Sequence, residues 1–180
     1  MATTLSSIKL VQRLSANVQG VDSGGGIQGS IPIGGTNNTV LTTTDADLMY
    51  SFEVTWSAGT HDATWTLQTG AVVSDGGTCI VTGVTGSTSG AYDVNGVALP
   101  NAVDIVAIYY EAPAGNAGDV TVVPSSSAHE FGTLTFKGGD SKQQSCLITP
   151  RVAHGSKTIT LGNSTGASIL KVVCLAKDGV

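Results

Sequence analysis

The chain has 180 residues, only 12% of which are charged, and a formal net charge of −5. The length suits one domain with a sizeable core, and the acidic balance argues against a nucleic-acid binder, which would present a basic face. No run approaches the roughly 20 apolar residues of a membrane span, and residues 1–20 lack the apolar core of a secretory signal, so we expect no membrane partner. The 24 glycines and the abundant serine and threonine indicate a β protein with many turns. A surface so poor in charge suits a subunit that associates with other copies.

Residues 1–37 are predicted to form an N-terminal arm. Leu5, Ile8 and Val11 keep near-helical spacing, so a short helix is one alternative for the first part of this arm. The valines of the same stretch favour a strand equally well, so an extended arm is the other alternative.

The second part of the arm, residues 20–38, contains seven glycines and one proline and cannot build a core by itself. A purely flexible linker would have no use for large apolar residues, yet this segment contains three isoleucines. We therefore predict an arm that docks on a partner through Ile27, Ile31 and Ile33.

Residues 38–180 are predicted to form an all-β domain. Tyr50, Phe52, Val54 and Trp56 alternate with polar residues, as in an antiparallel strand with one buried face. The domain is predicted to contain about ten short strands, drawn from twelve candidate stretches at intervals of roughly 8–15 residues, with no convincing helix after residue 20. The candidate strands are residues 39–43, 50–56, 63–69, 71–73, 78–82, 92–99, 102–112, 119–123, 131–136, 143–149, 157–161 and 168–177. This spacing predicts an antiparallel β-sandwich or jelly roll.

The strand at residues 102–112 is apolar on both faces, which predicts cover on both sides by a second sheet, the arm or a neighbouring subunit. A loop of small residues then predicts a hairpin with residues 119–123. Tyr109 and Tyr110 are adjacent, so one of them faces away from the other. We predict that the outward one contacts a partner chain.

The three cysteines, Cys79, Cys146 and Cys174, are an odd number at wide spacing. We expect reduced, buried thiols that act as small hydrophobic groups, which fits synthesis in a reducing cytoplasm.

No group of ionisable residues predicts a metal site. Asp45 with Asp47, and Asp93 with Asn95, offer oxygen ligands but lack the closing glutamate of a calcium loop, so we interpret them as turn residues. The histidines are too dispersed for zinc; they are His61, His129 and His154.

Catalytic patterns are equally weak. Glu53, Glu111 and Glu130 lie on or near strands, but Glu53 is expected to face solvent, and residues 86–90 do not form a nucleophile elbow. We predict no catalytic residue, no metal, no cofactor and no enzymatic activity.

The aromatic residues leave one alternative open. Trp56 and Trp65 are expected in the core, but a carbohydrate-binding or adhesin module would expose at least one of them as a sugar-stacking platform.

Four segments of the last third resemble the terminal strands of head-decoration and fibre-type sandwiches in tailed bacteriophages. They are residues 131–136 (FGTLTF), 146–150 (CLITP), 157–163 (KTITLGN) and 169–175 (ILKVVCL). The resemblance is one of texture and extends over roughly residues 40–180. It implies a virion structural protein, made in the host cytoplasm, of the capsid decoration type. It also implies a homo-oligomer, commonly a trimer, bound to the major capsid protein or another virion protein. A tail or fibre component is the alternative within this class; the tail-tube family has a helix against its sandwich, which we do not expect here.

Overall fold

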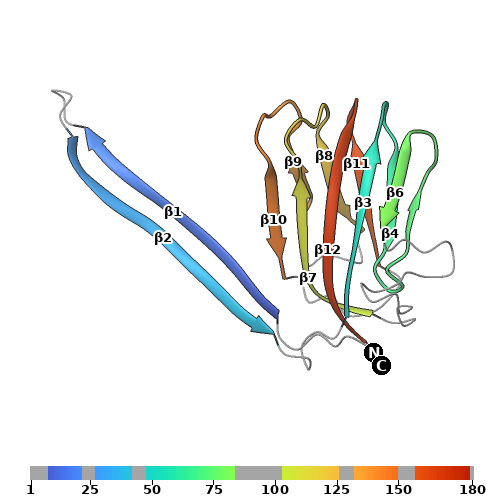
Figure 1. The fold of residues 1–180 in the computed structure, drawn as a ribbon, viewed down its shortest axis with the longest axis horizontal. Helices are drawn as coiled ribbons and strands as arrows, with labels where there is room; N and C mark the ends of the chain where they lie inside the picture. The colour runs from blue at the N-terminus through green and yellow to red at the C-terminus, as the bar shows by residue number, and fades with distance from the viewer. Residues whose placement is uncertain are drawn as a thin grey trace. The chain divides into compact units, whose positions relative to one another are not determined.

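A computed structural model describes residues 8–21, 27–41, 48–83, 103–125, 132–149 and 157–178 (Figure 1). Every regular element among these residues is a β-strand, which confirms the predicted all-β class. The chain divides into two compact units, one formed by Leu5–Thr44 and the other by Asp45–Val180 together with the first four residues.

The smaller unit is an antiparallel hairpin of two long strands, β1 (Ile8–Val21) and β2 (Ile27–Leu41). Of the two alternatives for the arm, the structure has the extended one and not the helix. The predicted first strand of the sandwich at residues 39–43 is wrong, because residues 39–41 belong to β2. The reason is that β1 supplies a long pairing partner whose register continues to Ile8 opposite Leu41.

The described residues of the larger unit form two antiparallel five-stranded sheets, which we call sheet I and sheet II. In order across the sheet, sheet I contains β10 (Gln144–Ile148), β7 (Val103–Ala112), β12 (Ser168–Asp178), β3 (Leu48–Trp56) and β6 (Cys79–Gly83). Sheet II contains β5 (Val72–Ser74), β4 (Asp62–Thr66), β11 (Thr158–Asn163), β8 (Val120–Pro124) and β9 (Leu134–Phe136). The arrangement is a β-sandwich, as predicted.

The strand order can be read as a jelly roll with two additional strands. When β5 and β6 are set aside, the orders are β3-β12-β7-β10 and β4-β11-β8-β9. The first sheet then contains the first, eighth, third and sixth strands of eight, and the second sheet contains the second, seventh, fourth and fifth. In this order β7 and β8 lie in different sheets, so the predicted hairpin between them is wrong. Both edges of β7 are already paired, with β10 and β12, and the loop at residues 113–119 carries the chain to sheet II.

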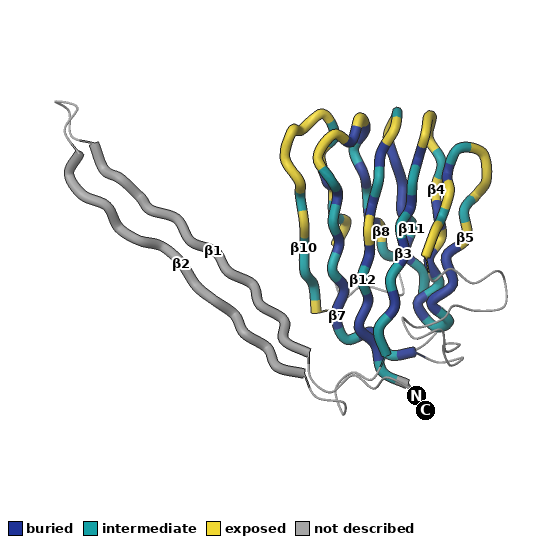
Figure 2. Tube along the Cα trace, viewed as in Figure 1, coloured by how far each residue is buried: buried dark blue, intermediate teal, exposed yellow. Residues whose placement is uncertain are grey.

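The core lies between the two sheets. Tyr50, Phe52, Val54 and Trp56 of β3 are all buried, as their alternation predicted (Figure 2). Trp65 of β4 packs edge-to-face on Tyr50 and Phe52, with ring centroids 6.1 and 5.2 Å apart. These aromatic contacts join sheet I to sheet II.

Strand β7 changes its inward face halfway along its length. Val103 and Ile105 are buried, and beyond Ala107 the buried positions become Ile108 and Tyr110. The pairing with β12 skips Val106, which is a β-bulge that reverses the alternation. The strand is apolar on both faces because each half of it turns a different face into the core. Its apolar pattern therefore does not require the cover on both sides that the sequence predicted.

Candidate interaction surfaces

The two adjacent tyrosines of β7 have different environments. Tyr110 is 0% exposed and packs near Phe136 in the core, with ring centroids 6.3 Å apart. Burial raises the pKa of Tyr110 well above its usual value. Tyr109 is half-buried on the outer face of sheet I, where its hydroxyl donates to Glu111 Oε2 over 3.2 Å. Tyr110 is thus excluded as a contact residue, and Tyr109 remains the candidate.

The three predicted isoleucines belong to the other unit. Ile31 and Ile33 lie in β2 opposite Val18 and Ala16 of β1, so the register places them on one face of the hairpin. Ile27 pairs with Val21 beyond an irregularity in the register. Tyr109 and the isoleucines are therefore parts of two separate surfaces, one in each unit.

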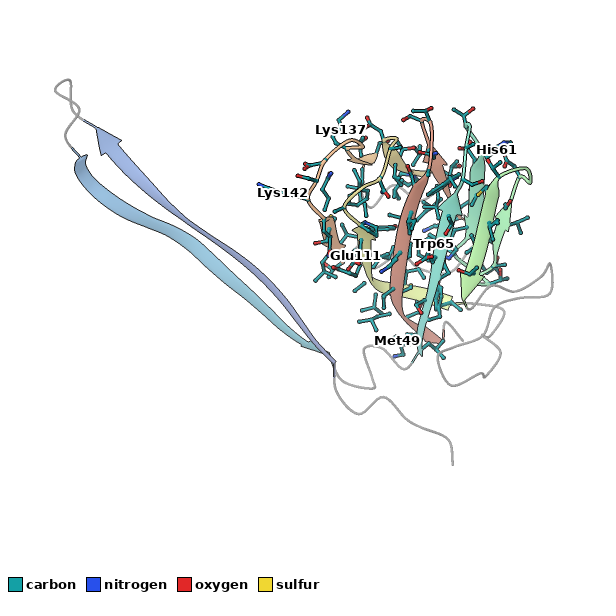
Figure 3. The ribbon with its side chains drawn as sticks, turned by 45° about the horizontal axis from the view of Figure 1, so that its top comes forward. Met49, His61, Trp65, Glu111, Lys137 and Lys142 are labelled. Atoms are coloured by element: carbon teal, nitrogen blue, oxygen red, sulfur yellow. The ribbon has the colours of Figure 1, made fainter. Side chains whose placement is uncertain are left out.

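A row of charges crosses the outer face of sheet I. Lys171 of β12 is the register partner of both Glu53 on β3 and Glu111 on β7, and its Nζ lies 3.5 Å from Glu111 Oε1. Glu111 is labelled in Figure 3. Two strand spacings, roughly 10 Å, separate the two glutamates, and the lysine stands between them. They do not form a carboxylate pair that faces a common cleft. An exposed ion pair of this kind contributes about 0–1 kcal/mol to stability.

The same outer face includes an apolar residue for which the sequence predicted no contact. Ile80 on edge strand β6 is 56% exposed, the largest value among the exposed large hydrophobic residues that the structure describes. The alternation of β6, with Cys79 buried and Ile80 outward, was a signal that could have identified it. A groove of about 280 Å³ runs nearby between β12, β3 and β6 and is lined by Ser51, Glu53, Thr82 and Val173, among others.

The outer face of sheet II contains several threonines on neighbouring strands. Register places Thr64 beside Thr160, Thr66 beside Thr158, and Thr121 beside Thr135. Their sequence signal is the repeated Thr-x-Thr pattern of β4 and β11. Val73 and Val123, 49% and 39% exposed, lie on the same sheet. This face offers hydroxyl and methyl groups but few ionisable ones, so it is suited to contact and not to acid–base chemistry.

The loops after β3, β7, β9 and β11 are bonded together at one end of the sandwich, which we call the loop end. The side chain of Asn116 makes two hydrogen bonds of 2.9 Å with the backbone N–H and carbonyl of Ile169. Ala117 N–H donates to Ala167 O over 2.8 Å, and Gly139 N–H donates to Asn116 O over 2.7 Å. These bonds join loops from both sheets and fix the position of strand ends far apart in the sequence.

Two glycines allow this close approach. A Cβ on Gly138 would lie 2.8 Å from the Cα of Gly118, and a Cβ on Gly118 would lie 2.6 Å from Asn163 Oδ1. Both distances are too short for a real side chain. The loop end therefore requires a residue without a side chain at both positions.

An acidic residue completes the loop end. Asp119 accepts from Lys137 Nζ over 2.7 Å and from the Gly138 N–H over 2.9 Å (Figure 3). The bond from Lys137, and to a smaller extent the bond from the Gly138 N–H, hold the pKa of Asp119 below its usual value.

The prediction of buried thiols is confirmed for Cys79 and Cys174 but is wrong for Cys146, which is half-buried near the edge of sheet I. Burial raises the pKa of Cys174 to about 12 and also raises those of Cys79 and Cys146, which makes all three poor nucleophiles.

The remaining ionisable candidates are only partly placed. His61 Nδ1 lies 3.3 Å from Asp75 Oδ1 at the loop end. Within the described ranges, no group of three or more His, Cys, Asp or Glu is arranged to hold a metal ion. Several residues considered above lie outside the described residues: Asp45, Asp47, Asp93, Asn95, His129, Glu130 and His154.

Among the residues whose placement is known, none forms a helix long and apolar enough to cross a membrane. No protein-family model, no curated protein and no solved structure matches the chain.

Proposed function

We propose that this protein is a structural component of a tailed-bacteriophage virion. It acts as a capsid decoration protein that associates with its own copies and docks on the particle through its N-terminal hairpin and its strand surfaces. Its partners are the major capsid protein or another virion protein, and its location is the virion after synthesis in the host cytoplasm. A tail or fibre component is the alternative within the same class.

The main support for this proposal is a difference between the two units: the sandwich has its own core, whereas the described strands of the hairpin form a single layer. The sandwich buries its aromatic and aliphatic residues between its own two sheets. The described residues of the hairpin unit form two paired strands, and a two-stranded hairpin is marginally stable alone in water. A chain that combines a complete domain with an incomplete one is suited to assembly, because the incomplete part gains its second layer from a partner.

The fold supports the proposal only by analogy. Jelly rolls occur in viral capsid proteins and also in lectins, so strand order does not choose between these classes. The two tryptophans favour the first class over a carbohydrate-binding or adhesin module. Trp56 and Trp65 are both 0% exposed, whereas sugar stacking needs an aromatic ring at the surface.

Light scattering coupled to size-exclusion chromatography tests the proposal on the full chain. We expect an oligomer, with a trimer favoured, and co-sedimentation with phage particles that lack the protein. Removal of residues 1–44 should leave the sandwich folded, as judged by tryptophan fluorescence, and abolish attachment to particles. A monomer that binds glycans and does not co-sediment with particles would contradict this proposal and would indicate a carbohydrate-binding module.

A further inference from the structure

The register of the hairpin separates its residues into an apolar face and a polar face. Residues directly opposite each other in an antiparallel pair share a face, and the faces alternate along each strand. The first face contains Ile8, Leu10, Gln12, Leu14, Ala16 and Val18 of β1. Opposite them are Leu41, Thr39, Asn37, Gly35, Ile33 and Ile31 of β2. We call these twelve positions the apolar face.

The intervening positions are mainly polar. They include Lys9 and Arg13, the two charged residues of the paired strands, together with Ser15, Asn17 and Thr36. The apolar face therefore has no charge, while the opposite face has two positive charges. This division is that of a sheet with one face against a core and one in water.

Within the part of the hairpin unit that the structure describes, no second layer covers the apolar face. We propose that this face packs against the same face of the hairpin in a neighbouring copy of the chain. The inference deepens the proposed function, since it rests on the self-association proposed there and names the surface that performs it.

Charge selects the apolar face, and not the polar face, for contact between two copies. Two apolar faces can meet without placing like charges opposite each other, because Lys9 and Arg13 remain on the outer sides. Contact through the polar faces would bring these four cations of two copies together. A face that packs against the same face of a second copy is related to it by a two-fold axis, which is the commonest symmetry among homo-oligomers.

The register pairs a large residue with a small one only near the middle of the face, where Leu14 lies opposite Gly35 and Ile33 lies opposite Ala16. Gln12 opposite Asn37 is the single amide pair on the face, and it would fix the register of the two hairpins if each amide bonds across the contact.

The area of the face indicates the strength of the contact. Strands of 14 and 15 residues give a face of roughly 450 Å² per copy, from about 3.4 Å per residue and 4.8 Å per strand. Two such faces bury roughly 900 Å², which is below the 1,200–2,000 Å² of standard stable interfaces. We therefore expect association that depends on protein concentration in the micromolar range.

Single aspartate substitutions on the two faces of the full-length chain test the proposal. Leu14→Asp and Ile33→Asp introduce a charge on the apolar face, and Ser15→Asp and Thr36→Asp introduce the same charge on the polar face. In sedimentation equilibrium we expect the first pair to weaken association at least roughly a hundredfold, because a buried carboxylate has no partner there. We expect the control pair to change it by less than about threefold. Tryptophan fluorescence, which reports on the buried Trp56 and Trp65, checks that each sandwich is folded.

Energy transfer between copies identifies what the apolar face contacts. Ser15→Cys, in a chain in which Cys146 is replaced by serine, accepts a donor dye in one sample and an acceptor dye in another. Residue 15 lies near the middle of the hairpin, so stacked hairpins bring the dyes close together in either relative direction. We expect strong transfer after mixing, and loss of transfer when Leu14→Asp is added to both chains.

The possible failures are distinguishable. A chain that stays monomeric at every concentration overturns both this inference and the self-association in the proposed function. An oligomer that survives Leu14→Asp and Ile33→Asp overturns this inference alone. Dissociation by these substitutions without energy transfer in the parent places the apolar face on a different surface and overturns the contact between hairpins.

Discussion

The sandwich and the hairpin use the same strand alternation with different results. In the sandwich, inward residues such as Val54 and Leu170 meet a second sheet and are 0% exposed. In the hairpin, the same period of two places the apolar residues on one face, but the described residues of that unit form a single two-stranded sheet. An amphipathic pattern thus specifies which face of a sheet is to be covered, but it does not specify what covers that face. The sandwich should therefore be stable by itself, and the hairpin should depend on a partner.

Substitutions of the two adjacent tyrosines of β7 should change the stability of the sandwich most, and they test which face of this strand lies in the core. Tyr110→Ala should lower the free energy of unfolding by about 3–5 kcal/mol, because it removes a ring from the core. Tyr109→Ala should lower it by less than about 1 kcal/mol and weaken oligomers instead. Urea denaturation and sedimentation equilibrium measure the two effects. Equal loss of stability in both variants would contradict the assignment of the two faces of β7.

The matched control for the first variant is Tyr110→Phe. The Tyr110 hydroxyl is buried without a hydrogen-bond partner among the described residues. Its removal should be neutral or slightly stabilising, since a buried polar group without a partner is costly. A loss of more than about 1 kcal/mol in this variant would indicate that the hydroxyl has a partner.

A smaller effect tests how the two sheets are closed at the loop end, a feature that the hairpin lacks. Gly118→Ala and Gly138→Ala should each destabilise the sandwich by about 1–3 kcal/mol, because each Cβ would overlap a neighbouring loop. Gly132→Ala is the control, because a Cβ there meets no atom within 4 Å. The midpoint of urea unfolding measures all three. If Gly118→Ala matches the control, the loops are not in close contact.

The fold was predictable where a strand obeys one local rule over its whole length. The alternation of β3 predicted its four buried residues, as the structure confirms. The same period of two holds in β12, where Leu170, Val172 and Cys174 are buried and Lys171 is exposed. The inward face of the second half of β7 was not predictable, because its bulge depends on pairing with β12 more than 60 residues away. The false hairpin between β7 and β8 has a related cause: which sheet a strand joins is decided by long-range partners.

The candidate surfaces show the same division. The sequence predicted that one of the two adjacent tyrosines faces outward, and the bulge determines that it is Tyr109. Its contact with a partner chain stays a prediction. The contacts at the loop end were missed, because Asn116 and Ile169 are 53 positions apart and nothing local predicts their pairing. The apolar face of the hairpin was also missed, since its twelve positions form one face only when the register of β1 on β2 is known.

The smallest expected effect is electrostatic and concerns the bonds of Asp119. The pKa of Asp119 is lower in the folded chain than its usual value of about 3.9, chiefly because of Lys137. The folded chain therefore binds this proton less readily than the unfolded chain, so the stabilisation is complete above the usual pKa and is lost as the pH falls through the lower folded value. Urea unfolding at pH 7 and pH 3 should show the wild type more stable than Asp119→Asn at pH 7, with a smaller difference at pH 3. Because Lys137 is well exposed, 1 M salt should also reduce the difference. A difference that is independent of both pH and salt would mean that the Gly138 N–H bond, which asparagine can retain, matters more than the charge.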